Sequence, residues 1–174
     1  MKKFLSLICL LGLTSPVLAQ GTFEQHEDLV RRVNQTEVKV KLNDEDCLET
    51  MAFGWYSAYD KEIIVCQEGM EEVGVQVGWT DEDLDTLRHE VHHFVQDCMT
   101  GGLTDGELAV IYDSPMNLAT DVLGLDGVSY LIQRYRENDA DDERIILELE
   151  AFAVATLNDP LEQIKDIDNY CVIE

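Results

Sequence analysis

The spacing of apolar residues along the chain changes near residue 78, from a pattern typical of strands to one typical of helices. Residues 37–42 alternate polar and apolar side chains, which predicts a half-buried strand. Residues 52–59 predict a second extended segment, and residues 62–66, rich in β-branched side chains, a third. A turn over 58–61 joins these two, and residues 23–34 before them suit an amphipathic helix.

Beyond Gly78 the apolar residues recur at helical spacing. Thr80 to Asp83 has the sequence of a capping box, which predicts a helix over residues 81–99 that stops at Gly101 and Gly102. Further helices are predicted over residues 116–123, 127–138 and 141–157. The chain is therefore expected to be α+β, with a small antiparallel or mixed N-terminal sheet packed on a helical C-terminal half.

The N-terminus has the pattern of a secretory signal peptide. Two lysines precede an apolar run from Phe4 to Leu13, and small residues end at Ala19. The run is too short to span a bilayer, so cleavage after Ala19 and export to the periplasm or the medium are expected. Residues 20–174 contain no linker, repeat or low-complexity segment, which predicts one domain after the signal peptide of residues 1–19.

The chain of 174 residues has a net charge of −24, with 12 basic against 36 acidic residues. Such a charge argues against a nucleic acid or an anionic membrane as partner, because a polyphosphate is bound by clustered lysine and arginine. An apolar fraction of 45 % excludes a disordered acidic tail. Any charged partner is therefore expected to be a cation or a basic molecule.

Four cysteines remain after removal of the signal peptide, and an even number in an exported chain predicts two disulfides. Four cysteines allow three pairings. We favour Cys47 with Cys66, since both flank the same strand region, which leaves Cys98 to join the long helix to Cys171. The spacing does not exclude the other two pairings.

Three of the four histidines fall within the helix predicted over 81–99, and two of them form the pattern H-E-x-x-H. His89 and His93 are four residues apart, so both imidazoles lie on one helix face and can bind one metal ion. Glu90 lies beside that metal, where its carboxylate can take a proton from water. Two alternatives stay open: His92 replaces His93 as ligand, or the histidines are only partly exposed polar residues.

A catalytic zinc needs a third protein ligand. His26 lies in the N-terminal helix, so a carboxylate is expected. On a helical wheel of residues 145–155, Glu150 falls among apolar residues and Glu148 on a more polar side, so we predict Glu150 as ligand with Glu148 as the alternative. The second carboxylate could hold a ligand imidazole through its other nitrogen. The alternative that Glu150 is an ordinary helix residue also stays open.

These residues resemble the zincin metallopeptidases, and more narrowly the gluzincins, in which H-E-x-x-H and a glutamate on a later helix hold zinc. The matching residues are His89, Glu90, His93 and Glu150, and the segment LRHEVHHFVQDC over residues 87–98 is also similar to small bacterial or phage proteins of this class. The resemblance covers roughly residues 62–157. It implies a zinc peptidase and, by analogy, an edge strand over residues 61–66 that pairs with an extended peptide substrate.

The residues thus predict an exported zinc peptidase in which Glu90 activates water. The oxyanion donor stays open among Tyr112, Tyr130 and Tyr135, and Gln96 shares the face of His93 and is a candidate partner for it. The acidic charge suits a cationic peptide or protein substrate, or simply keeps the chain dissolved in salty surroundings.

Two other functions compete with this one. A non-catalytic zinc-binding domain could keep the zincin fold as an interaction module, although metal binding alone does not require a glutamate at position 90. An acidic binding protein stabilised by disulfides, without any metal, is the second alternative.

Overall fold

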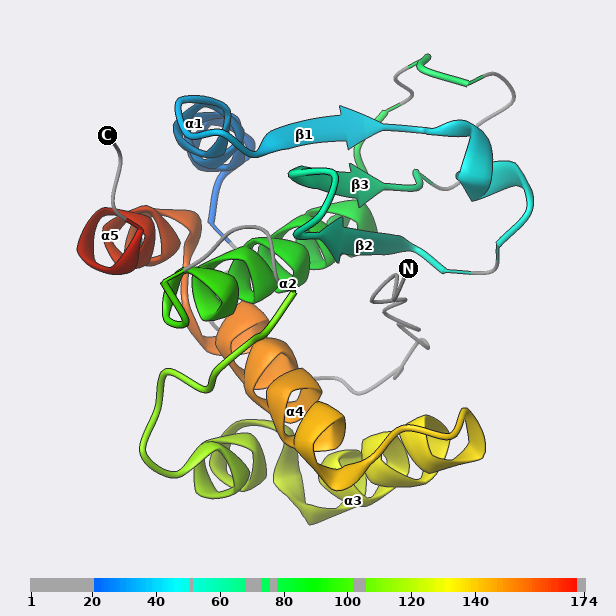
Figure 1. Cartoon of the computed structure of the whole chain (residues 1–174), viewed down its shortest axis with the longest axis vertical. Helices are drawn as coiled ribbons and strands as arrows, with labels where there is room; N and C mark the ends of the chain where they lie inside the picture. Colours follow the sequence, from blue (N-terminus) through cyan, green and yellow to red (C-terminus); the bar gives the residue numbers. More distant parts are fainter. Residues whose placement is uncertain (1–20, 51, 68–72, 76–77, 102–105, 172–174) are drawn as a thin grey trace.

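The computed structural model describes residues 21–50, 52–67, 73–75, 78–101 and 106–171, and the predicted signal peptide lies outside these residues. The predicted α+β class is confirmed, with the strands in the N-terminal half and most helices after them (Figure 1). In chain order the elements are α1 (Phe23–Asn34), β1 (Lys39–Leu42), the 3-10 helix η1 (Glu45–Leu48), β2 (Gly54–Ser57), β3 (Glu62–Val65), α2 (Asp81–Cys98), α3 (Pro115–Glu137), α4 (Asp142–Leu157) and α5 (Pro160–Tyr170).

The three strands form a mixed sheet in the order β1-β3-β2. Ile63 of β3 pairs with Val40 of the parallel strand β1 on one side and with Tyr56 of the antiparallel strand β2 on the other. The expectation that residues 61–66 form an edge strand is therefore wrong, because both sides of β3 are hydrogen-bonded within the sheet. The edges available for a further strand belong to β1 and β2.

Helix α2 is the central element of the fold. It packs between the sheet and α4, and α3 lies on the far side of α4 (Figure 1). Every residue from Thr86 to Asp97 is buried, since neighbouring elements cover α2 on opposite sides. The polar residues of this helix therefore face other protein groups instead of water, and each needs a partner there.

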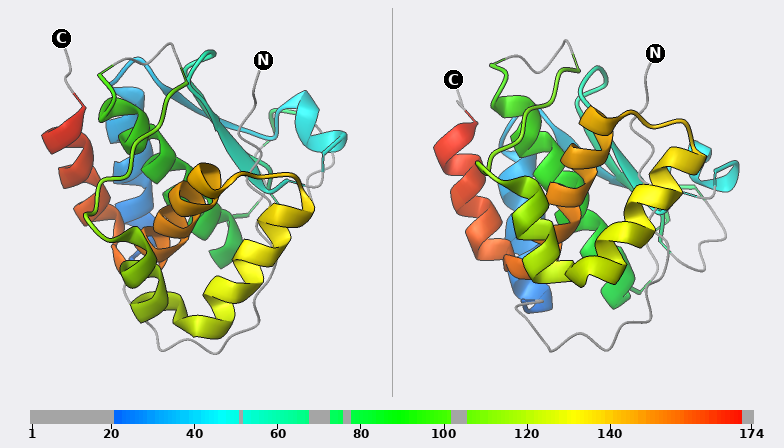
Figure 2. Two further views of the ribbon diagram at one scale, coloured as in Figure 1. Left: turned by 60° about the horizontal axis from the view of Figure 1, so that its bottom comes forward. Right: turned by 90° about the horizontal axis from the view of Figure 1, so that it is seen from below.

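Helix α5 was not predicted from the sequence. Asp159 caps its first turn and Pro160 occupies its first position, a combination that favours helix initiation. Gln163 and Ile167 are buried, and the helix runs beside α1 and against α2 (Figure 2).

The helices predicted over residues 116–123 and 127–138 are two arms of one element, α3. Gly124 interrupts the helical backbone with φ 73° and ψ 164°, a conformation that glycine adopts without a steric penalty. The arms meet at a bend (Figure 2), and the second arm packs along α4 through Val128, Leu131 and Tyr135. This packing brings a tyrosine of α3 close to the acidic residues of α4.

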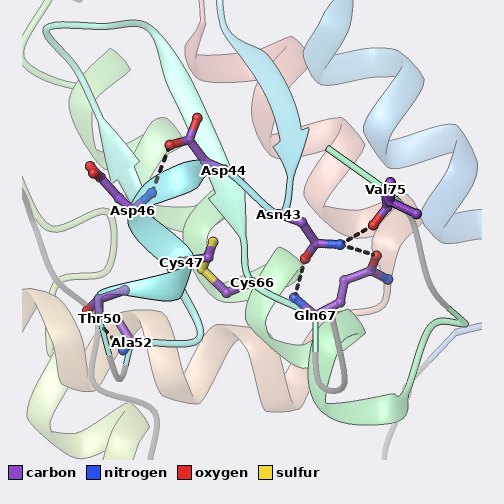
Figure 3. The surroundings of a disulfide bond; sticks show 9 residues. All are labelled: Asn43, Asp44, Asp46, Cys47, Thr50, Ala52, Cys66, Gln67 and Val75. Carbon is purple, nitrogen blue, oxygen red and sulfur yellow. Dashed lines mark hydrogen bonds between the residues drawn. A yellow bond between two sulfur atoms is a disulfide. The ribbon is translucent and has the colours of Figure 1, made fainter. Parts of the chain in front are cut away.

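The predicted disulfide pairing is confirmed. Cys47 of η1 bonds to Cys66, just after β3 (Figure 3), and Cys98 at the end of α2 bonds to Cys171, just after α5. The pairs are separated by 19 and 73 residues, for which loop-closure entropy gives about 3 and about 4 kcal/mol of stabilisation.

Beside the first disulfide, Asn43 adopts a left-handed backbone with φ 55° and buries its amide. Its side chain accepts from the backbone nitrogen of Gln67 and donates to the side chain of Gln67 and the carbonyl of Val75 (Figure 3). Together, the disulfide and this amide hold the ends of the strands to the segments that follow them. Among the described helices, none has the length and apolar character needed to cross a membrane.

Candidate metal centre

The centre begins with the regular geometry of α2. Thr80 accepts a hydrogen bond from the backbone of Asp83, and the Asp83 carboxylate accepts one from the backbone of Thr80, which confirms the predicted capping box. The helix then runs without interruption through His89 and His93, one turn apart. Their Nε2 atoms lie 3.1 Å from each other, and both side chains are almost completely buried.

Glu148 of α4 completes a cluster with these two histidines. Its Oε2 atom lies 3.2 Å from Nε2 of His89 and 3.5 Å from Nε2 of His93. A zinc ion with tetrahedral bonds of about 2.0–2.1 Å separates its ligand atoms by about 3.3 Å. The three atoms therefore have the mutual spacing of zinc ligands, and two imidazoles with one carboxylate are a donor set that zinc accepts.

The electrostatics of the cluster also favour a cation. Burial would raise the pKa of Glu148, but the two imidazoles outweigh burial and hold that pKa well below its ordinary value. Burial lowers the pKa of His89 to about 4, so this imidazole is neutral at pH 7. Burial also acts against a charge on His93, yet the attraction of Glu148 and Glu90 raises its pKa to about 9. Without a metal, a proton on His93 supplies the positive charge.

Two aromatic residues enclose the cluster. The hydroxyl of Tyr135, on the second arm of α3, donates a hydrogen bond of 2.7 Å to Oε2 of Glu148. The ring of Phe152 packs against His89 with 4.4 Å between the ring centroids. The sequence indicates Tyr135 only as one of three candidate oxyanion donors. It does not single out Phe152, although a position four residues after Glu148 places both on the same face of α4.

The structure brings Glu148, and not Glu150, to His89 and His93. Glu150 instead accepts hydrogen bonds from Nε2 of His92, from the Gln96 amide and from the backbone of Ile111 and Tyr112. The helical wheel wrongly placed Glu148 on a polar side, because α4 is covered by α2 on one side and by α3 on another. What looked like its polar side is the buried interface that holds Glu148.

His92 is likewise placed away from the cluster. Its Nε2 atom lies 3.0 Å from Oε1 of Glu150, and the imidazole is buried. Burial lowers the pKa of His92, so the neutral ring donates its Nε2 proton to the carboxylate. The interpretation of the three histidines as partly exposed polar residues is wrong, since all three are buried.

Glu90 and Gln96 flank the histidines. Glu90 is fully buried beneath β2, where a Cβ atom added to Gly54 would lie 3.5 Å from its Cγ. Oε1 of Gln96 lies 2.8 Å from Nδ1 of His93, as expected of a partner for that ring. Both residues therefore lie next to the candidate ligands on α2.

The remaining tyrosine candidates lie elsewhere. The Tyr112 side chain interacts with Asn158, at the end of α4, while its backbone nitrogen donates to Glu150. Tyr130 packs at the edge of the apolar cluster formed by α3 and α4. The hydroxyl of Tyr135, in contrast, donates to Glu148 of the cluster.

A family model described as Domain of unknown function (DUF8637) matches residues 22–172, a span that includes every described helix and strand. Comparison with the curated proteins and with the solved structures found no match. The family description assigns no activity, so function has to be argued from the chemistry of the site.

Proposed function

We propose that this chain, which belongs to the family described as Domain of unknown function (DUF8637), is an exported zinc-dependent peptidase with His89, His93 and Glu148 as zinc ligands. One observation carries the proposal: three ligand atoms from α2 and α4 lie 3.1, 3.2 and 3.5 Å apart, with Glu90 adjacent to the first of them in sequence. The two disulfides are in keeping with export to an oxidising compartment.

A zinc ion in this centre would supply Lewis acidity, which polarises a peptide carbonyl and lowers the pKa of a water molecule toward neutrality. Glu90 takes the proton from the attacking water and then gives it to the leaving amine nitrogen, so one carboxylate serves as base and as acid. Tyr135 is the oxyanion donor that lies at the cluster, but its single hydroxyl proton is donated to Oε2 of Glu148. It can stabilise the oxyanion of the tetrahedral intermediate only by exchanging that hydrogen bond.

The proposed substrate is a peptide or protein. With a net charge of −24, the chain attracts basic peptides over long distances and repels nucleic acids and anionic membranes. The strand edge nearest to Glu90 is that of β2, since Gly54 of this strand approaches the Glu90 side chain. All four residues of β2 are buried, so an extended peptide could pair with this edge only if the edge were uncovered.

The test uses the secreted chain without a histidine tag, digested against a mixed peptide library. We expect cleavage by the wild type with zinc, none after chelation, and none by Glu90→Gln, which should keep one zinc per chain. Glu143→Gln, at an exposed site in the first turn of α4, is the matched control and should cleave normally. Cleavage that survives in Glu90→Gln, or that never required zinc, would overturn the proposal.

The burial of the cluster favours one competing function. His89, Glu90, His93 and Glu148 are each no more than 1 % exposed, which suits a zinc ion held for structure in a non-catalytic interaction module. In that case the wild type binds zinc, cleaves no peptide in the library, and unfolds at lower temperature after chelation. The same digest and a melting curve with and without chelator therefore separate the two functions.

A further inference from the structure

We propose that Glu150, which is not among the three converging ligands, is a positioning residue that acts through Gln96 to fix which ring nitrogen His93 can offer to a metal. This inference rests on the proposed zinc site. The two glutamates of α4 would then have separate tasks: Glu148 binds the metal, and Glu150 orients a histidine that binds it.

The first step is the orientation of the Gln96 amide. Its Nε2 group lies 3.1 Å from Oε1 of Glu150 and 3.2 Å from the carbonyl oxygen of Leu147. An ionised carboxylate and a carbonyl can only accept hydrogen bonds. The NH₂ group of Gln96 must therefore face these two atoms, and its carbonyl oxygen must face the other way, toward His93.

The second step is the tautomer of His93. Oε1 of Gln96 is 2.8 Å from Nδ1 of His93, and since this oxygen can only accept, Nδ1 must carry the proton. The lone pair of a neutral His93 is then on Nε2, the atom that faces His89 and Glu148. An inverted Gln96 amide would favour the opposite tautomer, with a proton pointing into the metal centre.

The third step is the anchoring of Glu150 itself. The carboxylate is completely buried and receives hydrogen bonds from His92 and from the backbone nitrogens of Ile111 and Tyr112. These donors come from α2 and from the segment before α3, so the carboxylate cannot turn without breaking several of them. Glu150 is thus a fixed acceptor against which the Gln96 amide is set.

The experiment measures two properties in the folded chain, with ¹⁵N-labelled histidine and with zinc as the only metal. One is zinc affinity by competition with a chelator, and the other is the exchange rate of the His93 Nδ1 proton by ¹H–¹⁵N NMR. We expect a slowly exchanging Nδ1 proton in the wild type, with or without zinc. Glu150→Gln, which can turn an NH₂ group toward Gln96, should weaken zinc binding about 10- to 100-fold and speed exchange of that proton.

Gln96→Met is the second variant, because it removes the acceptor without changing Glu150, and it should give the same two effects. Gln163→Met is the matched control, because this buried glutamine of α5 donates its hydrogen bond to the backbone carbonyl of Arg88 and not to a histidine ring. This variant should lower stability while leaving zinc affinity and the exchange of the His93 Nδ1 proton unchanged. It therefore shows the effect of losing a buried hydrogen bond that does not involve His93.

The outcomes separate this inference from the proposed function. If the wild type binds zinc and both Glu150→Gln and Gln96→Met keep its affinity and its Nδ1 exchange rate, the positioning role is wrong while the zinc site stands. If the wild type binds no zinc, the proposed function fails. The metal-free chains then test the hydrogen bond from Nδ1 of His93 to Gln96, and an exchange rate unchanged in both variants would overturn the positioning role. Should Glu150→Gln not fold, Gln96→Met against Gln163→Met decides.

Discussion

His89 and His93 present their Nε2 atoms to each other at 3.1 Å across one turn of α2. Oε2 of Glu148 lies within 3.5 Å of both, and all three groups are buried. A proton between two of these atoms satisfies that pair, whereas one cation at their common centre satisfies all three. The three atoms could therefore hold one metal ion between them.

Removal of the Tyr135 hydroxyl tests how Glu148, the proposed third ligand, is held. Tyr135→Phe keeps the ring against α4 but deletes the hydrogen bond to Oε2 of Glu148. We expect zinc affinity to fall about 10-fold, because partners that orient a ligand carboxylate contribute to metal binding. The loss of one buried hydrogen bond should also cost about 1 kcal/mol of unfolding free energy. Chelator competition and urea denaturation measure the two effects.

Tyr112→Phe is the control for this variant, since its hydroxyl interacts with Asn158 and not with the cluster. It should leave zinc affinity unchanged. An equal drop in zinc affinity in both variants would mean that the effect of Tyr135→Phe is a general loss of stability and not a change at Glu148.

The sequence was sufficient to predict that His89 and His93 converge on one face of α2, but not that Glu148 lies beside them. His89 and His93 converge because four residues make about one turn, whatever surrounds the helix. The choice between Glu148 and Glu150 depends on which elements cover α4, and helical periodicity contains no information on that. The wheel assumed one buried side, whereas α4 lies between α2 and α3.

The same limit explains the errors in the fold. Residues 62–66 contain a strand as predicted. Their central position in the sheet depends on parallel pairing with β1, a contact between distant parts of the chain that local sequence patterns do not specify. In contrast, the two helices predicted over residues 116–123 and 127–138 are confirmed, because the bend at Gly124 divides α3 into two helical arms. Helix α5 does have a local signal, since Asp159 and Pro160 favour helix initiation at this point.

Gly54 allows β2 to approach α2 closely. A Cβ atom at this position would lie 2.6 Å from the carbonyl oxygen of Ile64 and 2.7 Å from Cγ2 of Thr86. We expect Gly54→Ala to lower the free energy of unfolding by about 1–3 kcal/mol, because neither the strand nor the helix backbone can move freely. Gly78→Ala, where an added Cβ meets no atom within 4 Å, should change stability by less than about 0.5 kcal/mol in urea denaturation. Equal changes in the free energy of unfolding for the two variants would contradict close packing at Gly54.

Asp166 of α5 should make stability depend on pH. Burial and the charge of Glu162 raise its pKa from 3.8 to about 6, so the folded state binds a proton more tightly than the unfolded state. The resulting stabilisation is complete below pH 4 and is lost as pH rises through 6. The neutral variant Asp166→Asn should therefore gain about 1–2 kcal/mol over the wild type at pH 8, and nothing at pH 4.

Urea denaturation at pH 4, 6 and 8 measures this difference. Asp168→Asn is the control on the same helix, because this more exposed aspartate is paired with Arg32. At pH 8 the free energy of unfolding of Asp168→Asn should fall by up to about 1 kcal/mol instead of rising. A gain for Asp166→Asn that is equally large at pH 4 would exclude an ionisation effect.

The position of the metal itself is the central claim, and anomalous diffraction at the zinc edge locates it directly. In crystals grown with one equivalent of zinc, we expect one peak about 2.0–2.2 Å from Nε2 of His89, Nε2 of His93 and Oε2 of Glu148. A map with no peak at this point, or with its peak between His92 and Glu150, would contradict the account.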